Sequence, residues 1–382
     1  MPLITLTGWF RESDSRERPA PHSPATTKQA EETQEEIMSL DMYNCTPKLA
    51  REAIIDCIQA GLVPMLKGSP GTGKSAGVHA IGEDFNLHLI DHRISTSTPV
   101  DFTGLPRFDA DGKARFSPFA DIFPTEDMTP PEGKDGWLLF LDEFNSGEED
   151  VQAAAYKLVL DRKVGQYKLH PKVAIVLAGN LATDKAIVKN LSTAMQSRIV
   201  HLKLELDFNE FMRDVAIPQK WDPRVIAYLN YKPKMLFDFK PDHNDETFCC
   251  PRTWDFLQRM IKDKQVEDRK TPQYGGTITS GVAVDFVQFT KVYSSVIKIA
   301  DVVRNPQAAA IPHDSSARWA TISHLASQVT DADLAPVAEY ADRYEMSFRI
   351  LFYRMLMMQH PTLRSNPVFA RSMVELSRYL ND

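Results

Sequence analysis

The stretch that decides the fold reads Gly68-Ser69-Pro70-Gly71-Thr72-Gly73-Lys74-Ser75. It matches in full the pattern G-x-x-x-x-G-K-[ST] of a phosphate-binding loop. Its glycines let the backbone wrap around a phosphate with the N–H groups pointing inward. In such a loop Lys74 reaches the β- and γ-phosphates of ATP, and the hydroxyl of Ser75 holds Mg²⁺. The loop therefore predicts an ATP and Mg²⁺ site, and an ordinary glycine-rich turn is the alternative.

Alternating strand and helix patterns extend on both sides of this loop. Apolar runs that are typical of strands cover residues 62–67, 87–92, 137–141, 173–178 and 199–206. The run 137–141 is apolar throughout, as expected for a central parallel strand. Helical patterns lie between the runs, among them residues 46–60 with Thr46 as the cap, and 148–160, where Ser146 and Glu149 would form a capping box. The alternation predicts an α/β fold with a parallel sheet.

Polar side chains follow two of these strands. Asp142 and Glu143 come after the run 137–141, and Asn180 follows the run 173–178. A carboxylate at the end of a buried strand is costly without a partner. Mg²⁺ would be that partner for Asp142, while Glu143 polarises the attacking water. Asn180 would orient the same water beside the γ-phosphate. The structural alternatives are an acidic turn at a strand end and a turn asparagine.

The composition narrows the class of protein. A net charge of -7 counts against nucleic acid as the main substrate. The cysteines lack the C-x-x-C spacing of a zinc site, which favours reduced thiols in a cytoplasmic protein; they are Cys45, Cys57, Cys249 and Cys250. Because no apolar run reaches the roughly 18 residues that a membrane span needs, we expect no membrane association.

The rest of the chain divides into four expected segments. Residues 1–39 are polar and proline-rich and predict a disordered arm. Residues 40–206 hold the strand and helix pattern. Residues 207–265 look helical, a turn-rich stretch at 266–276 suggests a linker, and residues 266–382 together form a largely helical extension. The run 346–358, rich in Met, Leu and Phe, predicts a core helix, with a partner-docking helix as the alternative.

These motifs resemble those of the AAA+ ATPases, and more narrowly of the MoxR-like and dynein-related group with its midasin- and McrB-type motors. Residues 60–75 look like the family's Walker A region, Leu141-Asp-Glu-Phe-Asn145 like Walker B, and Ala178-Gly-Asn180 like sensor 1. Residues 99–118 resemble its helix 2 insert, a β-hairpin that faces a pore. The family often has Ile-Asn-Arg where this chain has Phe144-Asn145-Ser146, and residues 266–382 match no part of it.

The resemblance implies a parallel sheet with helices on both faces, a small helical lid, and a ring, most often a hexamer. Met195-Gln-Ser-Arg198 resembles the segment with the arginine finger, and Cys250-Pro-Arg252 resembles sensor 2 of the lid. Arg198 and Arg252 thereby join Glu143 and Asn180 as candidate catalytic residues. Arg162 is the alternative candidate for the arginine finger that contacts the nucleotide of a neighbouring subunit in trans. Each arginine also has a purely structural alternative: a surface ion pair for Arg198, and a position at a helix end for Arg162 and Arg252.

Three functions are compatible with these residues. The leading one is an ATP-hydrolysing, protein-remodelling ring, similar to MoxR-type chaperones that act with a von Willebrand A-domain partner. The second is a nucleic-acid motor of the McrB type, which the acidic charge disfavours. The third is a small-molecule phosphotransferase, which the acidic pair and Asn180 disfavour because they suit water as the acceptor.

Overall fold

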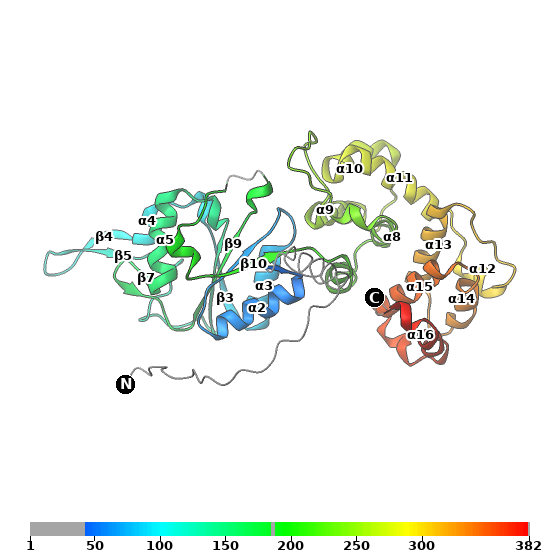
Figure 1. Cartoon of the computed structure of the whole chain (residues 1–382), viewed down its shortest axis with the longest axis horizontal. Helices are drawn as coiled ribbons and strands as arrows, with labels where there is room; N and C mark the ends of the chain where they lie inside the picture. The colour runs from blue at the N-terminus through cyan, green and yellow to red at the C-terminus, as the bar shows by residue number, and fades with distance from the viewer. Residues whose placement is uncertain (1–42, 185–187, 381–382) are drawn as a thin grey trace, which may run out of the picture. The chain divides into compact units, whose positions relative to one another are not determined.

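The structure is a computed structural model that describes residues 43–184 and 188–380, with side chains as far as residue 376 (Figure 1). The arm expected at residues 1–39 lies outside the described residues. The chain divides into two units, Met1–Asn44 and Cys45–Asp382, and the described residues belong to the second apart from Tyr43 and Asn44.

A six-stranded sheet forms the centre of the fold, in the order β1-β10-β2-β9-β6-β3. Its strands are β1 (Asn44–Cys45), β10 (Val200–Leu204), β2 (Pro64–Lys67), β9 (Val173–Gly179), β6 (Gly136–Asp142) and β3 (Leu87–Arg93). All pairings from β10 to β3 are parallel. The predicted parallel α/β sheet is therefore confirmed, and each predicted strand is present within a few residues of its expected bounds.

Helices pack on both faces of this sheet. In β6, Leu138 and Phe140 pack with α2 (Pro47–Gln59) and α3 (Lys74–Asp84). The alternate residues Leu139 and Leu141 pack with α5 (Glu149–Asp161) on the other face. Because successive side chains of a strand point to opposite faces, an apolar strand such as β6 can supply two hydrophobic layers at once. The full burial of β6 follows from this placement.

One expected helix start is wrong. Ser146 was predicted to cap α5 in a capping box with Glu149, but it closes a 3₁₀ turn, Phe144–Ser146. The helix cap is Glu148, whose side chain makes no capping hydrogen bond. The turn forms because Phe144, two residues after the end of the strand, is completely buried, and the helix cap therefore lies two residues later than predicted.

The insert expected at residues 99–118 contains the predicted hairpin. The short helix α4 (Pro99–Thr103) leads into β4 (Leu105–Phe108), which pairs antiparallel with β5 (Ala114–Ser117) (Figure 1). Phe108 on β4 is 74% exposed and Phe116 on β5 is 52% exposed.

The remainder of the chain is helical, as predicted. Its principal helices are α7 (Phe208–Phe211), α8 (Pro223–Tyr231), α9 (Pro251–Ile261), α10 (Thr271–Ile278), α11 (Ser280–Ser294), α12 (Ile299–Arg304), α13 (Ser315–Gln328), α14 (Leu334–Ala341), α15 (Met346–Gln359) and α16 (Pro367–Leu380). One hydrophobic cluster includes buried residues from Phe211 to Leu376. The linker predicted at 266–276 is instead partly helical: α10 begins at Thr271, because Pro272 suits a first helical turn. Helix α15 buries Phe352 and Leu356 in this cluster, which is the predicted core position.

None of the described helices combines the length and the apolar character that crossing a membrane requires.

Candidate nucleotide-binding site

The glycine-rich loop joins β2 to α3 at the carboxyl edge of the sheet. Gly71 has φ 77° and Gly73 has φ 94°, which are left-handed conformations that favour glycine. Space is also limited at Gly71, since a Cβ there would lie 2.3 Å from the Sγ of Cys250. Cys250 directly precedes α9, so the segment expected to be the lid packs onto the loop at this point.

The side chain of Lys74 is buried and makes three hydrogen bonds within the loop and its surroundings. It is 8% exposed, and its Nζ donates to Gly68 O (2.6 Å), Ser69 O (3.0 Å) and Asn180 Oδ1 (3.4 Å). Burial lowers the pKa of Lys74 to about 8, against the opposing influence of Asp142. The ammonium thus lies among oxygen acceptors in a poorly solvated position, where phosphate oxygens would favour its charged form.

Ser75 and Asp142 meet at the start of α3. The Ser75 hydroxyl donates to Asp142 Oδ2 at 2.9 Å, and the Glu143 backbone N–H donates to Asp142 Oδ1 at 2.8 Å. Asp142 is 7% exposed, and no ion pair to it occurs within the described ranges. A hydroxyl and a buried carboxylate, both oxygen ligands, suit Mg²⁺, which proteins bind through one or two carboxylates together with substrate phosphates. These two residues therefore fit a magnesium site beside the loop.

Glu143 adopts a left-handed conformation, with φ 54°, at the turn after β6. Its carboxylate accepts a hydrogen bond from Ser95 Oγ and lies 3.6 Å from Arg93 Nη1. Arg93, the last residue of β3, is paired in register with Asp142, and Ser95 lies in the 3₁₀ turn Ile94–Thr96 that follows, so the end of the neighbouring strand and its turn supply these contacts. The Glu143 side chain is 35% exposed, which leaves the carboxylate accessible to water.

Asn180 lies at the end of β9, between the loop and the acidic pair. Lysine only donates hydrogen bonds, so the Asn180 atom facing Lys74 must be Oδ1. The remaining Nδ2 group is a donor, able to contact the oxygen of a water or a phosphate. Asn180 is held through its backbone by the buried Asn145. Sequence reasoning gave Asn145 no role, although a polar residue directly after a buried strand and an acidic pair was a usable signal.

The three candidate arginines differ in position. Arg252, in the first turn of α9, lines the cavity at the loop. After burial, which is the main cause of the lowered pKa of Lys74, the positive charge of Arg252 lowers that pKa further, while Asp142 raises it. Arg198 is exposed and donates to Ala194 O at 2.9 Å. Arg162 donates to the carbonyls of His170 and Val173, at the start of β9. Since Asn180 directly follows the other end of β9, Arg162 lies at the opposite edge of the sheet from the loop.

A cavity of about 490 Å³ opens from the loop toward the helical segment. Besides loop residues, its lining includes the apolar side chains of Leu206, Phe211, Val215 and Trp221 and the charged side chains of Arg252, Glu210, Asp214 and Asp255. Apolar surface for a base, together with the glycine-rich loop and Arg252 for a triphosphate, suits a nucleotide.

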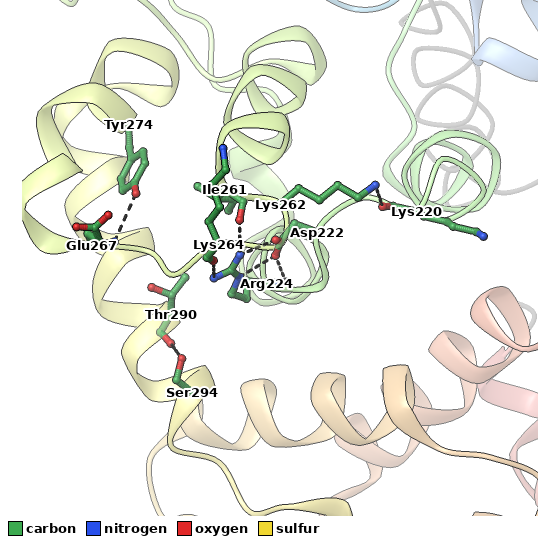
Figure 2. Close-up of polar contacts among 10 residues, drawn as sticks. All are labelled: Lys220, Asp222, Arg224, Ile261, Lys262, Lys264, Glu267, Tyr274, Thr290 and Ser294. Carbon is green, nitrogen blue, oxygen red and sulfur yellow. Dashed lines mark hydrogen bonds and ion pairs between the residues drawn. The ribbon is translucent and has the colours of Figure 1, made fainter.

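A polar network ties together two helical segments that each contribute residues to this cavity, through residues that do not themselves line it (Figure 2). Arg224 forms a two-fold ion pair with Asp222, through Nε–Oδ1 (2.8 Å) and Nη2–Oδ2 (2.6 Å). It also donates to Ile261 O and Lys264 O, each at 2.8 Å, at the end of α9. The network links the segment after Trp221 to the helix whose other end carries Arg252.

No family model matches the chain, and no curated protein matches it. Among solved structures the chain is similar to the RuvB Holliday junction branch migration motor of Thermotoga maritima, with 14% identity, 66% of this chain and 76% of that chain covered, and a TM-score of 0.35. A point mutant of the same protein matches with 15% identity over 65% of this chain and 74% of that chain, with a TM-score of 0.34. Both TM-scores are low, and the function proposed below therefore rests on the geometry of this site.

Proposed function

We propose that this chain is an AAA+ ATPase that binds Mg-ATP at its glycine-rich loop and transfers the γ-phosphate to water. The hydrogen bond between Ser75 Oγ and Asp142 Oδ2 carries the proposal, because it joins the loop to the acidic strand end at one point. A loop without this partner would be an ordinary turn. A strand end without the loop would be an acidic turn.

Each residue has a role that its position supports. The loop N–H groups and Lys74 would bind the phosphates, and Ser75 and Asp142 would hold Mg²⁺, which supplies charge neutralisation at the β- and γ-oxygens. Glu143 would accept the proton of the attacking water. Asn180 would orient that water through its Nδ2 donor, because a donor can hold the water oxygen but cannot take its proton. Glu143 must exchange its contact with Ser95 or Arg93 for water before it acts.

Two variants test binding and hydrolysis separately. Lys74→Ala removes a charge-assisted contact worth about 1.5–3 kcal/mol, so ATP affinity in calorimetry should fall at least about tenfold. Glu143→Gln keeps the size of the side chain but not the base, so turnover should fall at least about 100-fold while ATP binding persists. Unchanged affinity in the first variant would rule out the loop assignment. Equal loss of binding and turnover in the second would make Glu143 a structural residue.

We further propose a ring, with a hexamer as the expected size, in which Arg198 contacts the nucleotide of the neighbouring subunit. Its exposure supports this role, since a finger must be accessible from outside its own subunit. Such a finger can contribute about 10³–10⁵ in rate. Arg198→Ala and Lys74→Ala proteins should each be nearly inactive, and mixed rings should regain part of the activity. Mixed rings without recovery would assign Arg198 a role within its own subunit.

For the substrate we propose protein rather than nucleic acid. The exposed Phe108 and Phe116 of the hairpin give an apolar surface that an unfolded polypeptide could contact, and the net charge of -7 disfavours a polyanion. Co-purification of a von Willebrand A-domain protein with the Glu143→Gln variant would support a chaperone of the MoxR type. An ATPase rate stimulated by DNA would instead favour a McrB-type motor.

A further inference from the structure

Asn145 connects the two strand ends that carry the catalytic candidates. It lies in the 3₁₀ turn directly after Asp142 and Glu143, and it is 3% exposed. Its Oδ1 accepts from Asn180 N at 3.0 Å, and its Nδ2 donates to Asn180 O at 2.8 Å. Because a backbone N–H can only donate and a carbonyl can only accept, both atoms of the Asn145 amide are assigned without ambiguity.

The surroundings of Asn145 are shaped for this contact. Gly179 precedes Asn180, and a Cβ at Gly179 would lie 2.4 Å from Asn145 Oδ1. The glycine is needed for close approach and not for its conformation, since its φ is not positive. The backbone carbonyl of Asn145 also accepts from Lys189 N at 2.7 Å, which ties the segment after Asn180 to the same turn.

We propose that Asn145 is a positioning residue for hydrolysis, which sets the Asn180 side chain between Lys74 and the water that Glu143 activates. The inference rests on the proposed ATPase function. Both hydrogen bonds of the amide are made to the backbone of one residue, so they fix the position and orientation of Asn180 relative to the turn that carries Glu143. The hydrogen bonds between Asn145 and Asn180 matter because β6 and β9 are neighbouring strands. The ends of these strands must keep a fixed relative position if the side chains of Glu143 and Asn180 are to contact the same water.

The main variant is Asn145→Asp, which keeps the shape and the acceptor but loses the donor to Asn180 O. The carboxylate would then face that carbonyl without a hydrogen between them, and Asn180 would move away. Misplacement of a positioned group by about 1 Å can cost roughly 100-fold in rate. We expect kcat for ATP to fall by that order, with the affinity for a non-hydrolysable ATP analogue changed less than about threefold.

A second variant disturbs the same contact from the other side. Gly179→Ala leaves Asn145 unchanged but places a methyl group against its Oδ1, so it should reproduce the loss in kcat. The matched control is Asn230→Asp in α8, where a buried amide with 8% exposure donates to Ile226 O at 2.8 Å. This control experiences the same chemical change away from the cavity and should keep its kcat.

A double-mutant cycle separates positioning from general stability. If Asn145 acts through the Asn180 side chain, Asn145→Asp should reduce kcat no further in an Asn180→Ala background. Multiplicative losses in the double variant would overturn the proposal, as would a normal kcat in both Asn145→Asp and Gly179→Ala, or a parallel fall of affinity and kcat. A wild-type protein that binds ATP without hydrolysing it would instead contradict the proposed function.

Discussion

If the proposed nucleotide site is right, the lowered pKa of Lys74 predicts that nucleotide affinity falls as the pH rises. The ammonium has an ordinary pKa of 10.5, which burial reduces to about 8 in the free protein. Bound phosphates favour the charged form, so binding must take up a proton once the pH rises above about 8. If the complex restores the ordinary pKa, Kd should be about tenfold higher at pH 9 than at pH 7, which is about 1.4 kcal/mol of binding free energy.

The assay is isothermal titration with a non-hydrolysable ATP analogue and Mg²⁺ at pH 7, 8 and 9. The phosphate groups themselves contribute little, since their last pKa is near 6. Repeating the titration at pH 9 in buffers of different ionisation enthalpy should reveal nearly one proton taken up. Lys74→Arg is the control, because a guanidinium stays charged across this range and should abolish the pH slope. A constant Kd in the wild type, or an equal slope in Lys74→Arg, would refute the reasoning.

The same pKa shift also affects folding. Because the folded-state pKa is lowered, the unfolded chain binds more protons between pH 8 and 10.5, so the contribution of Lys74 to stability should rise with pH over that window. Gly71→Ala should abolish nucleotide binding and lower the melting temperature, since the left-handed backbone alone costs about 1–2 kcal/mol and the new methyl group meets Cys250; unchanged binding would mean that the loop relaxes freely. Arg162→Met should lower the free energy of unfolding by about 1.5–3 kcal/mol in denaturant titrations, while the ATPase rate of the assembled protein is unchanged. A lower ATPase rate without a lower stability would instead identify Arg162 as the arginine that contacts the neighbouring subunit's nucleotide. Arg224→Met should cost about 3–5 kcal/mol because it leaves Asp222 buried and unpaired, and adding Asp222→Asn should recover part of the loss in the same titration; an uncorrected loss would mean that Arg224 acts through packing.

Much of the site could be read from short stretches of sequence. The loop, the acidic pair and Asn180 each stand at the end of an apolar strand pattern, and parallel strands place such ends on one edge of a sheet. Helix α2 was predictable from Thr46 and Pro47 for the same local reason, since capping depends on neighbouring residues. The capping box at Ser146 failed because burial of Phe144, a tertiary effect, outweighed a local preference.

Other features depend on residues that are distant in sequence, and only the tertiary structure decided them. Three contacts follow from which strands and helices become neighbours: that of Gly71 with Cys250, that of Arg162 with the carbonyls of His170 and Val173, and that of Asn145 with the backbone of Asn180. The decisive step is the placement of β9 between β2 and β6, which brings Asn180 beside both Lys74 and Asn145. Strand order is set by the packing of whole layers, which hydrophobic periodicity does not encode. The sequence by itself therefore determined the residues of the glycine-rich loop and the chemistry proposed for it, and the tertiary structure determined which residues lie around it.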